Sequence, residues 1–113
     1  MITRLGPDAE LSAIVREAQA RGREVKVVQG GADKAGAMAA FAAALDFPDW
    51  FGGNLDALFD GLHQVAGDAD WDLVWDGTAA LANDHPDDYA MLLLVLEDWV
   101  EEYPGIGITV LER

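Results

Sequence analysis

Cysteine is absent from the 113 residues of the chain, which excludes a disulfide scaffold and a metal site built on thiolates. Long apolar runs are absent as well: the run of large apolar residues from Met91 to Leu96 has six residues. A membrane-spanning helix needs roughly 20. The opening residues, Met1 to Pro7, lack the apolar core of a secretory signal. We therefore expect a cytoplasmic protein with no membrane partner.

Basic residues are scarce. Seven lysines and arginines stand against 21 aspartates and glutamates, which gives a formal net charge of −14. Such a charge repels the phosphates of nucleic acids, so we expect no nucleic-acid partner. The same charge attracts a protein with a cationic cleft and accelerates its association.

Residues that carry catalysis are few and scattered. Ser12 is the single serine and has no nucleophile motif around it, and His63 and His85 lack the spacing of a helical zinc pair. Gly30-Gly31 has neither the P-loop pattern nor that of a dinucleotide-binding turn. Acidic pairs such as Asp87-Asp88 are typical of a solvated face. These absences predict a protein that is not an enzyme and has no cofactor and no metal site.

The composition and the hydrophobic pattern predict a single α/β domain. Just over half of the residues are apolar, and the length suits one core. Helical periodicity is found near 7–21, from 33 to 47, from 54 to about 65 and from 87 to 103, and strand patterns at 24–29, 71–76 and 106–111. Helical crossovers between strands favour parallel pairing. We therefore expect a three-stranded parallel sheet packed with helices, with its second strand leaving the core near Asp76.

One loop is unusually rich in aromatic residues. The segment from Phe47 to Asn54 places Phe47, Trp50 and Phe51 beside a glycine pair, where a loop is ordinarily polar. We expect Phe47 and Phe51 to fold back onto the core. For Trp50, burial and exposure at a binding surface both stay open, since tryptophan is favoured at interface hot spots.

The helix that follows this loop has two different sides. Asn54 suits the N-cap, and one side is apolar: Leu55, Leu58, Leu62 and Val65. The other side carries Asp56, Asp60 and His63, with Phe59 on the border. Asp56 complements the helix dipole in the first turn, whereas Asp60 lies about two turns in and gains little from it. Asp60 is therefore the better candidate for a functional charge.

The sequence from Phe47 to Leu62, FPDWFGGNLDALFDGL, resembles the signature of the barstar family of ribonuclease inhibitors, and the element order is similar from about Glu24 to Leu111. The resemblance implies one barstar-like domain over residues 1–113, in which the helix near 7–21 is an addition. It implies a protein that is a monomer when free and forms a one-to-one complex with a ribonuclease. Asp60 would enter the active site of that enzyme where a substrate phosphate binds.

The resemblance also predicts the partner-binding residues: Trp50, Gly52, Asn54, Asp56, Phe59, Asp60, His63 and Asp98. Asp98 follows from matching the buried faces of the last helix, whereas matching the end of that helix gives Glu101 or Glu102. Trp50 and Phe59 replace other aromatic residues of the family, so polar contacts at both points would differ.

Two alternatives remain open at this point. One is an immunity or regulatory domain of the same fold whose partner is not a ribonuclease. The other is a small metal-assisted enzyme that uses Asp56, Asp60, Asp72 and Asp76, although no ligand spacing supports it.

Overall fold

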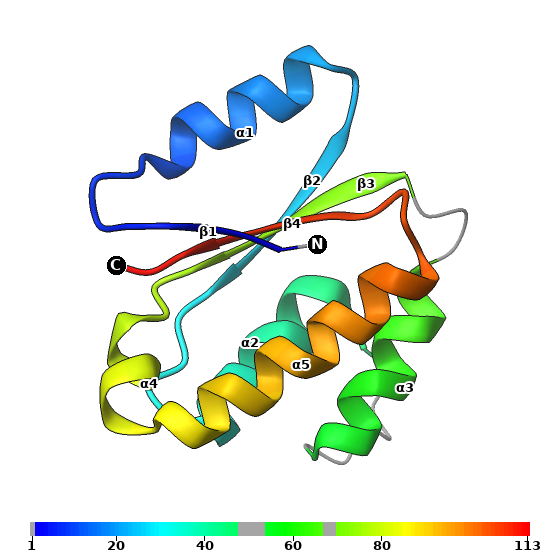
Figure 1. Ribbon diagram of the computed structural model, residues 1–113. Helices are drawn as coiled ribbons and strands as arrows, with labels where there is room; N and C mark the ends of the chain where they lie inside the picture. Colours follow the sequence, from blue (N-terminus) through cyan, green and yellow to red (C-terminus); the bar gives the residue numbers. More distant parts are fainter. Residues whose placement is uncertain (1, 48–53, 67–69) are drawn as a thin grey trace.

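The computed structural model describes residues 2–47, 54–66 and 70–113 and shows a parallel α/β fold (Figure 1). The elements in chain order are β1 (Ile2–Leu5), α1 (Leu11–Ala20), β2 (Glu24–Gln29), α2 (Lys34–Leu45), α3 (Leu55–Ala66), β3 (Trp71–Asp76), α4 (Ala79–Asp84), α5 (Pro86–Glu102) and β4 (Gly107–Leu111). The strands pair in the order β1-β4-β3-β2, and all three pairs are parallel. This arrangement confirms the predicted fold class.

The sheet separates two unequal layers of helices. α1 lies on one face, and α2, α3, α4 and α5 lie on the other, where most of the core is found (Figure 1). Side chains of a strand alternate between the two faces, so Trp71, Leu73 and Trp75 of β3 all point to the same side. The ring of Trp75 meets the ring of Phe41 in α2 with centroids 5.1 Å apart, and Trp71 meets Trp99 of α5 at 5.7 Å.

The predicted number of strands was wrong, because the sheet has four strands in the described part of the chain instead of three. The three predicted strands are β2, β3 and β4. The additional strand, β1, pairs with β4 from Ile2 opposite Ile108 to Leu5 opposite Leu111. Its four side chains show no alternation of apolar and polar residues, so the sequence carries no strand period there. Backbone pairing with β4 makes it a strand.

The helices differ from the predicted ranges at two places. The first helix begins at Leu11, not near residue 7, and Pro7 lies in the preceding turn. The short helix α4 was not predicted, because its six residues bury one large side chain, Leu81, and show no helical period. Asp33 caps α2 by accepting a hydrogen bond from the backbone N–H of Gly36. No helix among the described residues has the length and apolar character required to cross a membrane.

The far end of β3 also differs from the prediction. Asp76 does not leave the core but is 8% exposed and accepts two hydrogen bonds from the Arg113 guanidinium, at 2.7 and 2.9 Å. This bidentate pair outweighs the cost of burial and holds the pKa of Asp76 below its ordinary value.

At the start of β3 a second arginine joins three parts of the chain. Arg23 donates to the carboxylates of Asp72 and Asp70, both at 2.8 Å, and to the backbone oxygens of Trp71 and Gly105, at 3.0 and 2.6 Å. It thereby ties the start of β2 to β3 and to the turn between α5 and β4.

Candidate protein-binding surface

α3 is built so that its acidic side faces solvent. The Asn54 side chain accepts a hydrogen bond from the backbone N–H of Ala57 at 2.8 Å, which confirms the predicted N-cap. Leu58 and Leu62 are fully buried and Val65 is half-buried, whereas the side chain of Leu55 lies outside the described residues. With the leucines fixed in the core, Asp56 and Asp60 are exposed.

The aromatic loop enters this region through Phe47. Its ring is 8% exposed, as predicted, and packs against Gly61 in the middle of α3. Pro48 to Gly53 lie outside the described residues, and with them the predictions for Trp50, Phe51 and Gly52. The described part of the loop is therefore anchored on the same helix that carries Asp56 and Asp60.

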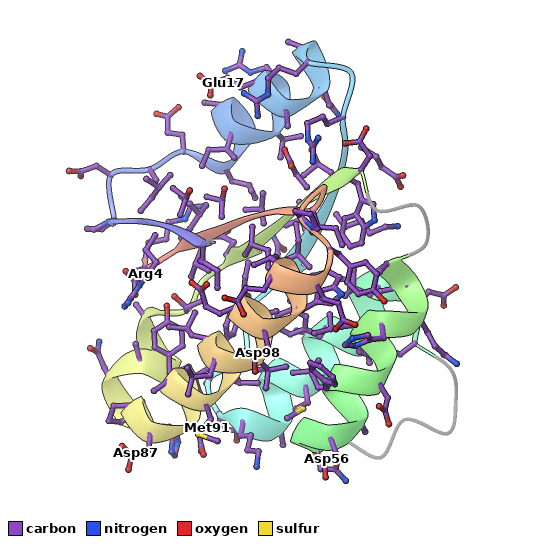
Figure 2. The ribbon with its side chains drawn as sticks, turned by 45° about the vertical axis from the view of Figure 1, so that its right-hand side comes forward. Arg4, Glu17, Asp56, Asp87, Met91 and Asp98 are labelled. Atoms are coloured by element: carbon purple, nitrogen blue, oxygen red, sulfur yellow. The ribbon has the colours of Figure 1, made fainter. Side chains whose placement is uncertain are left out.

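Three predicted acids are presented by two neighbouring helices. Asp56 and Asp60 lie on α3 and Asp98 on α5, and the two helices pack side by side. Figure 2 shows Asp56 at the start of α3 and Asp98 on the outer side of α5. Within the described parts of the chain, none of these three exposed carboxylates makes a hydrogen bond or an ion pair with a side chain. They are available to a cationic partner.

His63 occupies a less exposed position than the sequence suggested. It is half-buried, and its Nε2 lies 2.7 Å from Oε2 of Glu102 at the end of α5. Its Nδ1 lies 2.9 Å from the backbone oxygen of Phe59, one turn earlier in α3. Glu102 is thus engaged within the molecule, which leaves Asp98 and Glu101 as the exposed acids at this end of α5 without such a pair in the described structure.

The surroundings of His63 favour its charged form. Partial burial lowers the pKa of His63, but the bonds to Glu102 and to the Phe59 carbonyl and the charges of Glu102 and Asp60 outweigh this effect. The pKa of His63 therefore lies above its ordinary value.

Two exposed apolar side chains extend the same side of α5, and the sequence analysis missed them. Met91 is 47% exposed and Leu94 is 58% exposed. Met91 lies four residues after Asp87 and seven before Asp98, so these residues form one stripe along the helix (Figure 2). The signal was present in the spacing: Leu92, Leu96 and Trp99 define the buried side, and Met91 and Leu94 fall opposite to it.

The four acids of the metal-assisted alternative are not brought together. Asp72 and Asp76 are bound by Arg23 and Arg113, and in β3 they point to the face opposite Trp71 and Trp75. Asp56 and Asp60 lie on α3, on the other side of the sheet. The described ranges contain no group of three or more potential ligands able to hold a metal ion.

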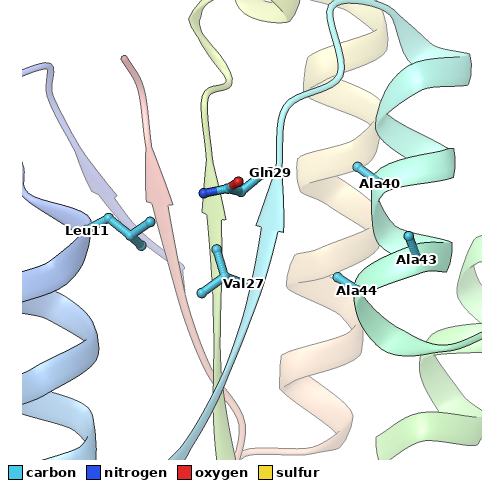
Figure 3. Close-up of a pocket in the computed structure, with 6 residues that line it drawn as sticks. All are labelled: Leu11, Val27, Gln29, Ala40, Ala43 and Ala44. Carbon is cyan, nitrogen blue, oxygen red and sulfur yellow. The ribbon is translucent and has the colours of Figure 1, made fainter.

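One hollow in the surface of the described residues lies away from these acids. It has a volume of about 500 Å³ and opens along β2 between α1 and α2 (Figure 3). Its lining consists of Leu11, Val27, Gln29, Ala40, Ala43 and Ala44. Because this lining carries no charged group, the hollow is no place for acid–base chemistry or for a cation.

The fold and the surface together define a parallel α/β domain that presents acids on two packed helices. Residues 23–111 match the family model described as Barstar (barnase inhibitor), and the chain belongs to the barstar family. That family consists of inhibitors of a ribonuclease. The match begins at the residue before β2, so β1 and α1 lie outside it. No curated protein matches the chain significantly.

Proposed function

We propose that the protein inhibits a microbial guanyl-preferring ribonuclease by plugging its active site with Asp60. The observation that supports this most is the placement of Asp60 in a chain of the barstar family. Its carboxylate is exposed on α3, whose opposite side is fixed in the core by Leu58 and Leu62. A charge on such a rigid support loses little conformational freedom when a partner binds.

The chemistry of the plug follows from the substrate of such an enzyme. A ribonuclease must hold a phosphate with cationic side chains, and a carboxylate offers those side chains the same negative oxygen acceptors. Charge-assisted hydrogen bonds in a desolvated interface are short and strong. In this proposal Asp60 takes the place of the phosphate, and Trp50, Gly52, Asn54, Asp56 and Phe59, which precede it in the sequence, are further contacts of the partner.

The acidic residues other than Asp60 favour the same kind of partner. Asp56 on the same helix and Asp98 on the neighbouring α5 add negative charge to the exposed surface of the two helices, and the whole chain carries a formal charge of −14. A cationic active-site cleft is steered toward such a surface before any contact forms. One inhibitor then covers one active site, which gives a one-to-one complex.

Titration of the protein into a panel of small microbial ribonucleases tests this function. We expect stoichiometric inhibition of at least one enzyme, and Asp60→Ala should weaken binding by roughly 2 kcal/mol or more while the melting temperature stays unchanged. Glu17→Ala is the matched control, because Glu17 is an exposed acid on α1, across the sheet (Figure 2). It should leave inhibition unchanged.

Two results would contradict the proposal. If no enzyme of the panel is inhibited, the partner is not a ribonuclease of this class, and an immunity or regulatory domain with another partner becomes the better account. If Asp60→Ala lowers stability as much as affinity, Asp60 has a structural role and is not the plug.

A further inference from the structure

Both ring nitrogens of His63 face atoms that can only accept hydrogen bonds. Nδ1 lies 2.9 Å from the backbone oxygen of Phe59, and Nε2 lies 2.7 Å from Oε2 of Glu102. A carbonyl oxygen and an ionised carboxylate have no hydrogen to donate, so each nitrogen must supply one. Neutral imidazole carries a single N–H, whereas the imidazolium carries two. Both hydrogen bonds can therefore form at the same time only when His63 is protonated.

The rings around His63 suit a cation as well. The Phe59 ring lies 4.2 Å from the imidazole, centroid to centroid, and the Tyr103 ring lies 5.4 Å away and nearly perpendicular to it. Aromatic rings attract cations electrostatically. The charged groups that act on His63 are both acids, Asp60 on α3 and Glu102 on α5.

We propose that His63 is a positioning residue of the partner-binding surface: as an imidazolium it clasps the end of α5 to α3 and keeps Glu102 engaged within the molecule. The backbone of Phe59, the residue before Asp60, is then bonded to a histidine that itself bridges two helices. Asp98 and Glu101, which have no such internal pair in the described structure, are then the acids that this end of α5 presents. The reference to a partner rests on the proposed function, whereas the clasp is a property of the free protein.

Loss of the proton must open the clasp in part. A neutral His63 can donate to Phe59 or to Glu102 but not to both, so one bond is lost. The pKa of His63 is raised in the folded protein, and the sign of the linkage follows. The stabilisation is fully present below the unfolded histidine pKa of about 6.5, and it is lost as the pH rises through the folded value.

Proton NMR of the histidine ring protons in the free protein tests the clasp directly. We expect His63 to titrate at a higher pH in the folded chain than in the urea-unfolded chain. Glu102→Gln should move the folded midpoint downward, and His85→Gln identifies the signal by elimination. A folded midpoint at or below the unfolded one, or a midpoint that Glu102→Gln leaves in place, would overturn the proposal.

The pH profile of the melting temperature provides a second readout. The wild-type protein should lose melting temperature relative to His63→Gln as the pH rises from about 5.5 to about 8.5, around the ordinary histidine pKa. His85→Gln should keep the wild-type profile. Parallel profiles for the wild type and His63→Gln would show that His63 is not a clasp.

Inhibition measurements separate the clasp from the proposed function. With a ribonuclease that the wild type inhibits, Asp98→Asn should weaken inhibition more than Glu102→Gln at about pH 6. The reverse order would show that Glu102 faces the partner, against the clasp. If no ribonuclease is inhibited, the proposed function fails, and the titration of His63 in the free protein still decides whether the clasp exists.

Discussion

The ring of Phe47 lies against the backbone of Gly61 so closely that a Cβ atom added to Gly61 would stand 3.0 Å from two ring carbons. Phe47 follows the end of α2, and Gly61 is in the middle of α3. The contact therefore places the residue that follows α2 against the middle of α3. The absence of a side chain at Gly61 is what allows the ring to lie there.

We predict that Gly61→Val destabilises the protein by about 1–3 kcal/mol, because the added methyl groups overpack the Phe47 ring. Urea unfolding gives the free energy of unfolding. Gln64→Val on the exposed side of the same helix is the control and should cost only a few tenths of a kcal/mol, the difference in helix propensity. Equal losses for the two variants would mean that the ring moves aside without cost.

The hydrogen bonds of Arg23 depend on the shape of its side chain, which a substitution can test. Its planar guanidinium serves four acceptors, two carboxylates and two backbone oxygens. A lysine cannot reproduce this fork, so Arg23→Lys should cost about 1–3 kcal/mol through acceptors left unpaired. Arg21→Lys is the matched change, because Arg21 is exposed and lies 3.7 Å from Asp72. It should be close to neutral, and a comparable loss there would contradict the special role of Arg23.

The same substitution should destabilise the protein strongly on the buried side of α5 and hardly at all on its exposed side. Leu96 is fully buried, and we expect Leu96→Ala to cost about 2–5 kcal/mol by leaving a cavity. Leu94 is 58% exposed, and Leu94→Ala should change the free energy of unfolding by less than about 0.5 kcal/mol. Chemical denaturation of both variants measures this. A large loss at Leu94 would show that this side chain is covered.

Acid should weaken the bond between Asp76 and Arg113. The bond to Arg113 lowers the pKa of Asp76, so its stabilisation is present above the unfolded aspartate pKa of about 3.9 and is lost as the pH falls through the folded value. Melting temperatures measured from about pH 5 downward should therefore fall more steeply for the wild type than for Asp76→Asn. Asp84→Asn, an exposed acid, should retain the wild-type slope. Identical slopes for all three proteins would contradict this prediction.

If the protein inhibits a ribonuclease as proposed, salt should affect the rate of association more than the rate of dissociation. Because the chain carries a formal charge of −14, raising the salt concentration should slow association more than it accelerates dissociation. Stopped-flow mixing at several ionic strengths measures both rates. An association rate that does not change with salt would remove electrostatic steering from the proposed mechanism.

Elements could be predicted from the sequence where burial of one face makes apolar residues recur at the spacing of a strand or a helix. The alternation of Trp71, Leu73 and Trp75 predicted β3, and the spacing of Leu58 and Leu62 placed Asp56 and Asp60 on the exposed side of α3. These are local consequences of burying one face. β1 could not be found in this way, because its pairing with β4 is made by backbone groups that any residue carries.

Side-chain pairs between residues far apart in the chain could not be predicted from the sequence either. Nothing in the spacing of His63 and Glu102 indicates that they meet, since they come together only when α3 packs against α5. The same is true of Asp76 and Arg113, which lie 37 residues apart in the chain. Charge composition showed that acids predominate but not which of them are already neutralised by a partner within the fold.

The position of β4 in the sheet has a consequence for how the chain acquires its structure. β4 lies between β1 and β3, yet it follows every other strand in the sequence. On the ribosome, β2 and β3 can pair as soon as both have emerged, whereas β1 has no neighbour to join until β4 is made. β1 can therefore pair only after the residues up to β4 have been synthesised. Its pairing has the greatest sequence separation in the sheet, and such pairings form slowly. We expect β1 to be the strand that chaperones find exposed during synthesis.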